Sequence, residues 1–328
     1  PRAGMVDSLD LKYSGIFSRG GSSPPEATRF LMNKKKLNII QNQNILITGG
    51  LGFVGSVLAE HLSKKNKITI IDNLFTGKLK NKSNNKNITY IISETSKINK
   101  ISKIQKVKFQ YIFHLGEYSR VEQSYDDIEK VVEFNTKPFF EILKFAKKND
   151  SKFIYSGSST RFASYTNSID LSPYAWSKIS NINLLKLFSK WYGFNYAITY
   201  FYNVYGDREI VNGKYATVIA KFIKMKKNKI DKLTITYPGT QKRNFTHVND
   251  VISALELIAL YGKGDGYGIG NNKSYSIIEI ARLLKMKYEI GPKKLGNRMA
   301  GTLKTNKTKK LGWDCKFDLK DYLKNKII

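Results

Sequence analysis

A tyrosine and a lysine four positions apart, Tyr174 and Lys178, could act together on a hydroxyl group. They open a long amphipathic segment, and residues four apart share one face of a helix, so both side chains can point into one site. A free tyrosine has a pKa near 10 and is a poor base at neutral pH, but a neighbouring ammonium group favours the phenolate. The pair therefore indicates general base chemistry; the alternative is a solvated lysine beside a half-buried tyrosine.

Three glycines, Gly49, Gly52 and Gly55, lie between an apolar run at residues 44–48 and a helical pattern at residues 56–64. The first permits a tight turn, the second lets backbone N–H groups approach a pyrophosphate, and the third lets the helix pack close to the strand. The helix N-terminus then presents partial positive charge to the phosphates. The full strand–glycine–helix pattern predicts a dinucleotide site rather than a tight turn without a ligand.

An acidic residue, Asp72, ends the next apolar run, at residues 67–71. Its carboxylate can accept hydrogen bonds from both adenosine ribose hydroxyls and would repel a 2′-phosphate. Lys78 and Lys80 follow it and weaken that discrimination. We therefore expect NAD, rather than NADP, as the cofactor.

Strand and helix patterns alternate through the first two thirds of the chain. Further strands are expected at residues 88–92, 111–115, 153–156 and 195–202, and helices at residues 131–148 and 177–191. Such alternation predicts an α/β fold with a Rossmann-type doubly wound parallel sheet. The rhythm is less regular after about residue 205, which indicates a smaller C-terminal α/β substrate domain.

An ordered set of short motifs runs from residue 44 to the end of the chain. The motifs are Thr48-Gly49-Gly50-Leu51-Gly52-Phe53-Val54-Gly55, Asp72-Asn73-Leu74, His114-Leu115-Gly116, Tyr155-Ser156-Gly157-Ser158, Tyr174-Ala175-Trp176-Ser177-Lys178, Tyr202-Asn203-Val204-Tyr205-Gly206, Arg243-Asn244-Phe245-Thr246-His247-Val248 and Leu311-Gly312-Trp313. Together they resemble the extended short-chain dehydrogenase/reductase family, which includes nucleotide-sugar epimerases and dehydratases such as UDP-glucose 4-epimerase. The resemblance implies an NAD-binding domain at residues 38–203, a nucleotide-sugar-binding domain at residues 204–328, and a homodimer.

The resemblance also implies roles for the catalytic residues. Tyr174 would take a proton from a sugar hydroxyl while hydride leaves the same carbon for the nicotinamide. Lys178 would stabilise the phenolate and hold the nicotinamide ribose. Ser158 would orient the reacting oxygen, with Thr160 as an accessory.

Binding residues follow from the same resemblance. Those expected to bind NAD are Gly49, Gly52, Phe53, Val54, Gly55, Asp72, Asn73, Leu115, Gly116, Tyr174, Lys178 and Tyr202. Those expected to bind a nucleotide-diphosphate sugar are Ser158, Asn203, Arg243 and Arg298. Arginine suits this role because its planar fork binds phosphate oxygens bidentately. No metal site is expected, because the three histidines fall in separate motifs and lack the spacing of metal ligands.

The segment after Ser158 bears on the type of reaction. In the resembling family, 4,6-dehydratases carry an Asp-Glu pair there and decarboxylases usually carry Glu nearby, whereas this chain has Ser159, Thr160 and Arg161. The missing carboxylates favour a C4 epimerase, in which the oxidised sugar takes hydride back on its other face. A 4,6-dehydratase or C4 oxidoreductase with acid and base residues from elsewhere is the alternative. A non-catalytic NAD- or nucleotide-binding protein is a remote third possibility.

Composition sets limits on partners and location. The formal net charge of +30 suggests nucleic acid or an anionic membrane as a partner, but the lysines are scattered and no arginine-rich arm accompanies them, so we expect neither. No run approaches the roughly 20 apolar residues of a membrane-spanning helix. The one cysteine, Cys315, excludes an intrachain disulfide and indicates a reducing compartment, the cytoplasm. Residues 1–31 differ in composition, and we expect a disordered or foreign leader with Met32 as the native start.

Overall fold

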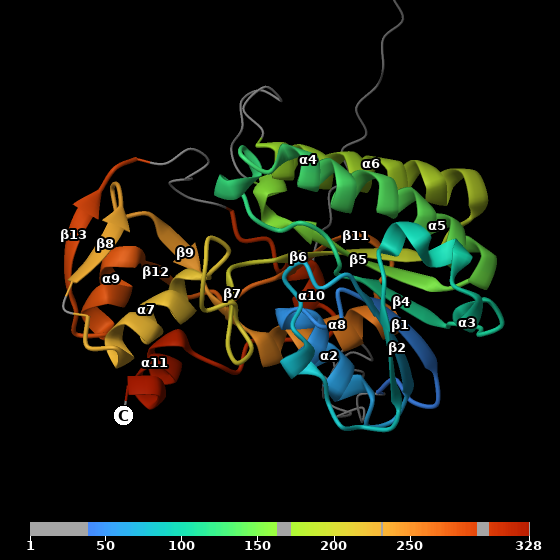
Figure 1. Ribbon diagram of the computed structural model, residues 1–328, viewed down its shortest axis with the longest axis horizontal. Coiled ribbons are helices and arrows are strands. Elements are labelled where there is room, and N and C mark those ends of the chain that lie inside the picture. Colours follow the sequence, from blue (N-terminus) through green and yellow to red (C-terminus); the bar gives the residue numbers. More distant parts are fainter. Residues whose placement is uncertain (1–38, 163–171, 231, 294–301, 328) are drawn as a thin grey trace, which may run out of the picture. The chain divides into compact units, whose positions relative to one another are not determined.

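Seven parallel strands form the central sheet (Figure 1) in a computed structural model that describes residues 39–162, 172–230, 232–293 and 302–327. The strands are β1 (Asn44–Thr48), β2 (Lys67–Asp72), β3 (Ile88–Ile92), β4 (Tyr111–His114), β5 (Lys152–Ser158), β6 (Tyr196–Phe201) and β11 (Gly264–Ile269). Their order is β11-β6-β5-β4-β1-β2-β3, so the direction of winding reverses between β1 and β4. This order confirms the doubly wound fold predicted from the sequence. The predicted leader at residues 1–31 lies outside the described residues.

The central strands are apolar because both faces of the sheet are covered. All residues of β1 except the first are buried. Successive side chains of a strand point to opposite faces; Ile45 and Ile47 join one core cluster and Leu46 joins the other. A continuous apolar run without polar alternation is the expected signature of such a strand.

Four helices cover the two faces of the sheet (Figure 1). They are α2 (Phe53–Leu62) and α8 (Val248–Tyr261) on one face, and α5 (Lys137–Asn149) and α6 (Pro173–Tyr192) on the other. Leu58 and Leu255 pack in the same core cluster as Ile45, and Phe139 and Leu185 pack in the cluster that holds Leu46. Each face of the sheet is therefore covered by two helices that are separated in sequence.

Helix α6 begins four residues before the predicted start at residue 177. Ser172 caps it, because the Ser172 side chain accepts a hydrogen bond from the Ala175 backbone N–H at 3.2 Å, and Pro173 occupies the first turn. The helix ends at Gly193, which has a φ of +64°. The earlier start places Tyr174 in the first turn of the helix.

The single helix predicted at residues 131–148 is interrupted. Helix α4 (Ile128–Val131) leads into a π-helical turn, η4 (Val132–Thr136), before α5 begins. Within the turn, buried Asn135 accepts a hydrogen bond from the backbone N–H of Tyr118 at 2.6 Å and donates one to the Ser177 hydroxyl at 2.9 Å. These tertiary bonds tie the turn to the loop after β4 and to α6, and π-turns of this kind are frequent at functional sites.

A third core cluster lies mostly among elements that follow residue 217 and also includes Tyr205. These elements are α7 (Val218–Lys227), β8 (Lys232–Thr236), α9 (Ile277–Leu283), β13 (Lys287–Gly291) and α11 (Leu319–Ile327). Strands β8 and β13 pair in parallel. Two smaller pairs are β9 (Lys242–Asn244) with β12 (Ser274–Ser276) and β7 (Val204–Tyr205) with β10 (Thr246–His247). The chain returns to the central sheet through α8 and β11, so the predicted division after residue 203 does not coincide with the edge of that sheet, and the two-domain division stays a prediction.

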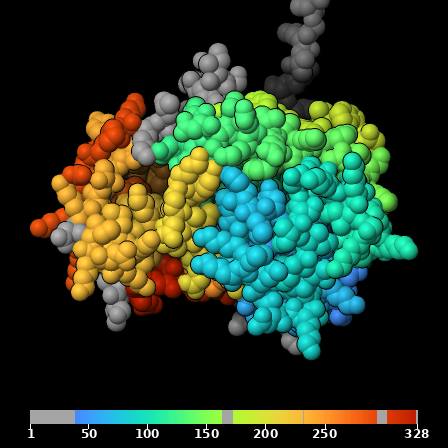
Figure 2. Space-filling model, in the orientation of Figure 1, coloured from blue at the N-terminus to red at the C-terminus, as the bar shows by residue number. Residues whose placement is uncertain are grey.

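The segment after β7 lies against the sheet-bearing part of the molecule. Figure 2 shows this segment, in yellow, directly beside the blue and green parts of the chain. Lys214 forms an ion pair with Asp127 at 2.9 Å, and Arg208 pairs with Glu60 of α2. These contacts hold the segment at residues 206–217 against α2 and against the residue that precedes α4.

The remaining described elements are short. They are α3 (Ser102–Gln105), α10 (Asn306–Lys309) and the 3-10 helices η1 (Leu79–Asn81), η2 (Thr95–Lys100), η3 (Glu122–Ser124) and η5 (Ser159–Phe162). In the described part of the chain, no helix combines the length and the apolar character needed to span a bilayer.

Candidate active site

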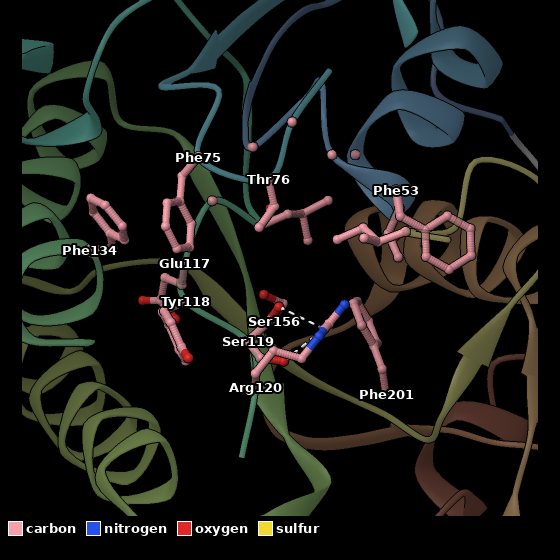
Figure 3. Close-up of a pocket in the computed structure, with 18 of the residues that line it drawn as sticks. Phe53, Phe75, Thr76, Glu117, Tyr118, Ser119, Arg120, Phe134, Ser156 and Phe201 are labelled. Carbon is pink, nitrogen blue, oxygen red and sulfur yellow. Dashed lines mark hydrogen bonds between the residues drawn. The ribbon is translucent and has the colours of Figure 1, made fainter. Parts of the chain in front are cut away.

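A cavity of about 470 Å³ lies at the carboxyl ends of the strands, beside the reversal point between β1 and β4 (Figure 3). Ligands of doubly wound sheets bind at this point. The residues predicted from the sequence that line the cavity are Gly49, Gly52, Phe53, Val54, Gly55, Asp72, Asn73, Leu115, Gly116, Ser158, Thr160, Tyr174, Lys178 and Asn203. The fold thus brings together most of the predicted site.

Two predicted residues that the structure describes do not line this cavity. The Tyr202 hydroxyl donates a hydrogen bond to the Thr302 carbonyl at 2.8 Å, and Tyr202 is buried. Arg243 lies on β9, where its Nη1 donates to the Lys242 carbonyl at 3.0 Å. A third predicted residue, Arg298, lies outside the described residues. The roles of all three in binding stay predictions.

The glycine loop is shaped by two close backbone approaches. Gly49 has a φ of +68°, and a Cβ atom on it would lie 2.6 Å from the Cα atom of Gly116, in the loop after β4. A Cβ atom on Gly55 would lie 2.2 Å from the Gly49 carbonyl oxygen. Gly52 is the N-cap of α2 and offers no side chain to the first turn. The N–H groups at this helix end are therefore left for a ligand in the cavity, where a pyrophosphate can accept their hydrogen bonds.

Asp72 is held by the loops around it. Its two carboxylate oxygens accept hydrogen bonds from the backbone N–H groups of Leu51, at 2.9 Å, and Leu74, at 2.8 Å. A Cβ atom on Gly77 would lie only 2.4 Å from its Oδ1. Burial raises the pKa of Asp72, and these backbone hydrogen bonds oppose the increase. The carboxylate is thus fixed at the end of β2, and each of its oxygens has a further lone pair that can accept from a ribose hydroxyl.

Tyr174, Lys178 and Ser158 converge on the cavity from α6 and from the end of β5. Tyr174 is 8% exposed, and the Nζ atom of Lys178 lies 6.0 Å from the centre of its ring. Lys178 also donates a hydrogen bond to the Ser156 carbonyl at 2.6 Å. The Ser158 oxygen accepts a hydrogen bond from the Thr160 hydroxyl at 2.9 Å, which leaves the Ser158 proton to point at a ligand.

Glu117 is a site residue that the sequence analysis missed. Its carboxylate lies 2.5 Å from the Nζ atom of Lys178, and both side chains are buried. Burial raises the pKa of Glu117, but the charge of Lys178 and the contacts with Lys178 and His114 outweigh it, so the net pKa is lowered. The available signal was its position three residues after β4, at the edge of the sheet where ligands bind.

Arg120 and Glu209 also line the cavity and were not predicted. The Arg120 side chain extends into the cavity toward Phe201 (Figure 3). Its Nε and Nη2 atoms donate to the Tyr215 carbonyl at 2.9 and 2.7 Å. Burial raises the pKa of Glu209 to about 7, although its oxygens accept hydrogen bonds from the Thr217 hydroxyl and from a backbone N–H. The cavity therefore contains charged groups beyond those of the predicted motifs.

The sequence pattern of the NAD dependent epimerase/dehydratase family matches residues 45–270, more than half of the chain. The chain belongs to this family. Its enzymes use NAD, and the residues of this epimerase/dehydratase family member fit that cofactor. The loop that contains Gly49 and Gly55 has no room for a Cβ atom at either glycine, and no side chain caps the N-terminus of α2.

Relatives of this family member include proteins named as epimerases, dehydratases and decarboxylases. A protein of Methanocaldococcus jannaschii assigned as a UDP-glucose 4-epimerase is 31% identical over 86% of this chain and 97% of its own length. The dTDP-D-glucose 4,6-dehydratase of Dictyostelium discoideum is 30% identical over 73% of this chain and 61% of its own length. The crystal structure of UDP-glucose 4-epimerase from Thermotoga maritima with UDP-glucose has a TM-score of 0.79 and 26% identity, covering 87% of this chain and 97% of that one.

The contact between Gly49 and Gly116 predicts a large effect of Gly49→Ala. The left-handed conformation alone costs an alanine about 1–2 kcal/mol, and the overlap with the Gly116 backbone adds about 1–3 kcal/mol. Gly193→Ala is the matched control, because Gly193 has a φ of +64° and a Cβ atom on it would have no other atom within 4 Å. Urea unfolding should show the larger loss for Gly49→Ala, with NAD affinity reduced about tenfold or more; equal losses for the two variants would contradict the contact.

Proposed function

We propose that the protein is an NAD-dependent nucleotide-sugar C4 epimerase. The observation that carries the proposal is the convergence of Tyr174, Lys178 and Ser158 on the cavity that the glycine loop lines. No carboxylate follows Ser158 at residues 159–161, where an elimination would need one. The similarity to proteins assigned or solved as UDP-glucose 4-epimerases supports the same reaction and suggests a UDP-sugar as the substrate.

In the proposed mechanism, Tyr174 accepts the proton of the C4 hydroxyl and later returns it. Ser158 donates a hydrogen bond to the same oxygen, oriented by its contact with Thr160. Lys178, fixed by the Ser156 carbonyl, would hold the ribose of bound NAD. When bound, NAD supplies the hydride acceptor for the sugar carbon. Asn203 lines the cavity and would bind the nucleotide part of the substrate.

A dehydratase is the second candidate, and one observation favours it. Glu209 lines the cavity, and burial raises its pKa to about 7, which is suited to a general acid or base. If it reaches C5 or C6 of the oxidised sugar, it would supply the group that is missing after Ser158. The relative from Dictyostelium discoideum carries out this kind of reaction by its name.

We expect the purified protein with NAD to convert one member of a UDP-, GDP-, CDP- and dTDP-sugar panel into an isomer of unchanged mass. Tyr174→Phe should keep NAD binding and lower kcat about 100-fold or more, because the base is removed while the ring remains. NMR and mass spectrometry identify the product and follow kcat, and calorimetric titration with NAD measures cofactor binding. A product lighter by one water would establish the dehydratase instead, and full activity of Tyr174→Phe would exclude Tyr174 as the base.

Asp72→Ala should weaken NAD binding about tenfold or more and reduce discrimination against NADP, because the ribose hydroxyls lose a charged acceptor. Asp72 also orders two loops, so Asp72→Asn, which keeps one acceptor oxygen, is the companion variant. Calorimetric titration with NAD and NADP, beside thermal unfolding, separates binding from folding. An unchanged NAD affinity in both variants would mean that the ribose is held elsewhere.

We infer that two copies associate through α6 and the segment around α4. Trp176, Leu187 and Trp191 are 46–58% exposed, and their spacing of eleven and four residues puts them on one stripe of α6. Ile128 and Val132 are also exposed, and α4 packs against α6. Exposed apolar side chains in this number mark an association surface.

Sedimentation velocity tests this association. The native protein should sediment as a dimer at micromolar concentration, and Trp191→Asp should shift it to a monomer, since a charge buried in an apolar interface is costly. Leu79→Asp, at a side chain that is 53% exposed on η1, is the control and should leave the dimer intact. A native monomer would contradict the inference.

A cytoplasmic location is proposed from the cysteine content alone.

A further inference from the structure

Four polar side chains meet at the Asp265 carboxylate, and none of them is among the described residues that line the cavity. They are Arg161 on η5, Lys186 on α6, Tyr200 on β6 and Asp265 itself on β11. Asp265 pairs with Arg161 at 2.6 Å and with Lys186 at 2.5 Å. The Tyr200 hydroxyl donates to Asp265 at 2.5 Å and accepts from Nη1 of Arg161 at 2.7 Å. The four side chains form one connected group, the Asp265 network.

Asp265 carries the charge that holds this network together. Its Oδ2 atom faces Arg161 and Lys186, and its Oδ1 atom accepts from Tyr200. Burial acts to raise the pKa of Asp265, but the hydrogen bonds from Lys186, Tyr200 and Arg161 outweigh it, so the net pKa is lowered. The carboxylate is therefore ionised at neutral pH and keeps its three partners.

The Tyr200 ring supports the turn that follows β5. Gly157 lies opposite Tyr200 in the pairing of β5 with β6, and a Cβ atom on Gly157 would lie 2.9 Å from Cε1 of Tyr200. At the other end of the turn, the centre of the Phe162 ring lies 4.7 Å from the centre of the Tyr200 ring. Arg161 adds its hydrogen bond to the Tyr200 hydroxyl. The turn is thus fixed to one tyrosine through a backbone contact, a ring contact and a hydrogen bond.

The same turn carries Ser158. The Ser158 oxygen accepts a hydrogen bond from the Thr160 backbone N–H at 3.2 Å and another from the Thr160 hydroxyl at 2.9 Å. Arg161 is the next residue, so its attachment to the network limits how far Thr160 can move. The direction of the Ser158 hydroxyl therefore depends on side chains that lie outside the cavity.

We propose that the Asp265 network positions the Ser158 hydroxyl relative to the Tyr174 base. Its members are positioning residues and do not touch the sugar. The inference rests on the proposed function, in which Ser158 and Tyr174 act on one oxygen. Because Lys186 belongs to α6, the helix that carries Tyr174, the same carboxylate anchors both the turn and the helix. A small displacement between two reacting groups lowers the rate strongly without a matching loss of binding.

Two conservative variants test the proposal. Tyr200→Phe removes the hydroxyl and keeps the ring, and Asp265→Asn removes the charge and keeps the shape. Each should lower kcat for the converted nucleotide sugar about tenfold and leave KM and NAD affinity within about twofold of native. The double variant should fall little below the weaker single variant, because both changes break one network. If Asp265→Asn does not fold, Tyr200→Phe decides alone.

Tyr90→Phe is the matched control. Tyr90 lies on β3 of the same sheet, and its hydroxyl accepts a hydrogen bond from the Ser83 backbone N–H at 2.8 Å. The control therefore loses a hydrogen-bonded tyrosine hydroxyl far along the sheet from β5, and its kcat should stay native. An equal fall of kcat in Tyr90→Phe would overturn the proposal, since the loss would then be a general effect of destabilising the sheet.

Hydrogen exchange provides a readout that needs no substrate. The Thr160 amide, which donates to Ser158, should exchange about fivefold faster in both test variants and at the native rate in Tyr90→Phe. Native exchange in both test variants, or faster exchange with native kcat, would overturn the inference. Faster exchange in a protein that converts no nucleotide sugar would sink the proposed function and leave the link between the network and the Ser158 turn standing.

Discussion

The site depends on how closely two backbone loops approach each other at the reversal point of the sheet. Strands β1 and β4 are neighbours, and the loops that leave them meet at Gly49 and Gly116, where a single Cβ atom would overlap the opposite backbone. The two loops form one wall of the cavity. The N-terminus of α2 borders one part of the cavity, and the loop after β4, with Glu117 and Arg120, borders another.

Charged groups that line the cavity are held by partners from separate elements. Asp72 is fixed by backbone N–H groups from two different loops, and Lys178 is fixed by β5 and by the β4 loop. Buried charges are tolerated only when they are paired or hydrogen-bonded. The same bonds that stabilise the fold therefore also orient the groups that would act on cofactor and sugar.

Local patterns in the sequence were sufficient for the first three strands and the cofactor loop, whereas β11 of the central sheet and the other strands after residue 203 were not predicted. The bounds of β1, β2 and β3 agree with the predicted runs, because each is a short apolar segment ended by polar residues. The predicted start of α6 was too late, since Ser172 and Pro173 signal a cap that periodicity alone does not reveal. The break near Asn135 was missed because it depends on bonds to Tyr118 and Ser177, which are remote in sequence. Glu117 and Arg120 were missed for the same reason: only the folded chain shows what they face.

The ion pair between Lys178 and Glu117 changes what mutagenesis of the lysine can reveal. Replacing Lys178 by an uncharged residue would leave a buried carboxylate without its cation, which typically destabilises a protein by about 3–5 kcal/mol. An inactive lysine variant would then report a folding defect as readily as a catalytic one.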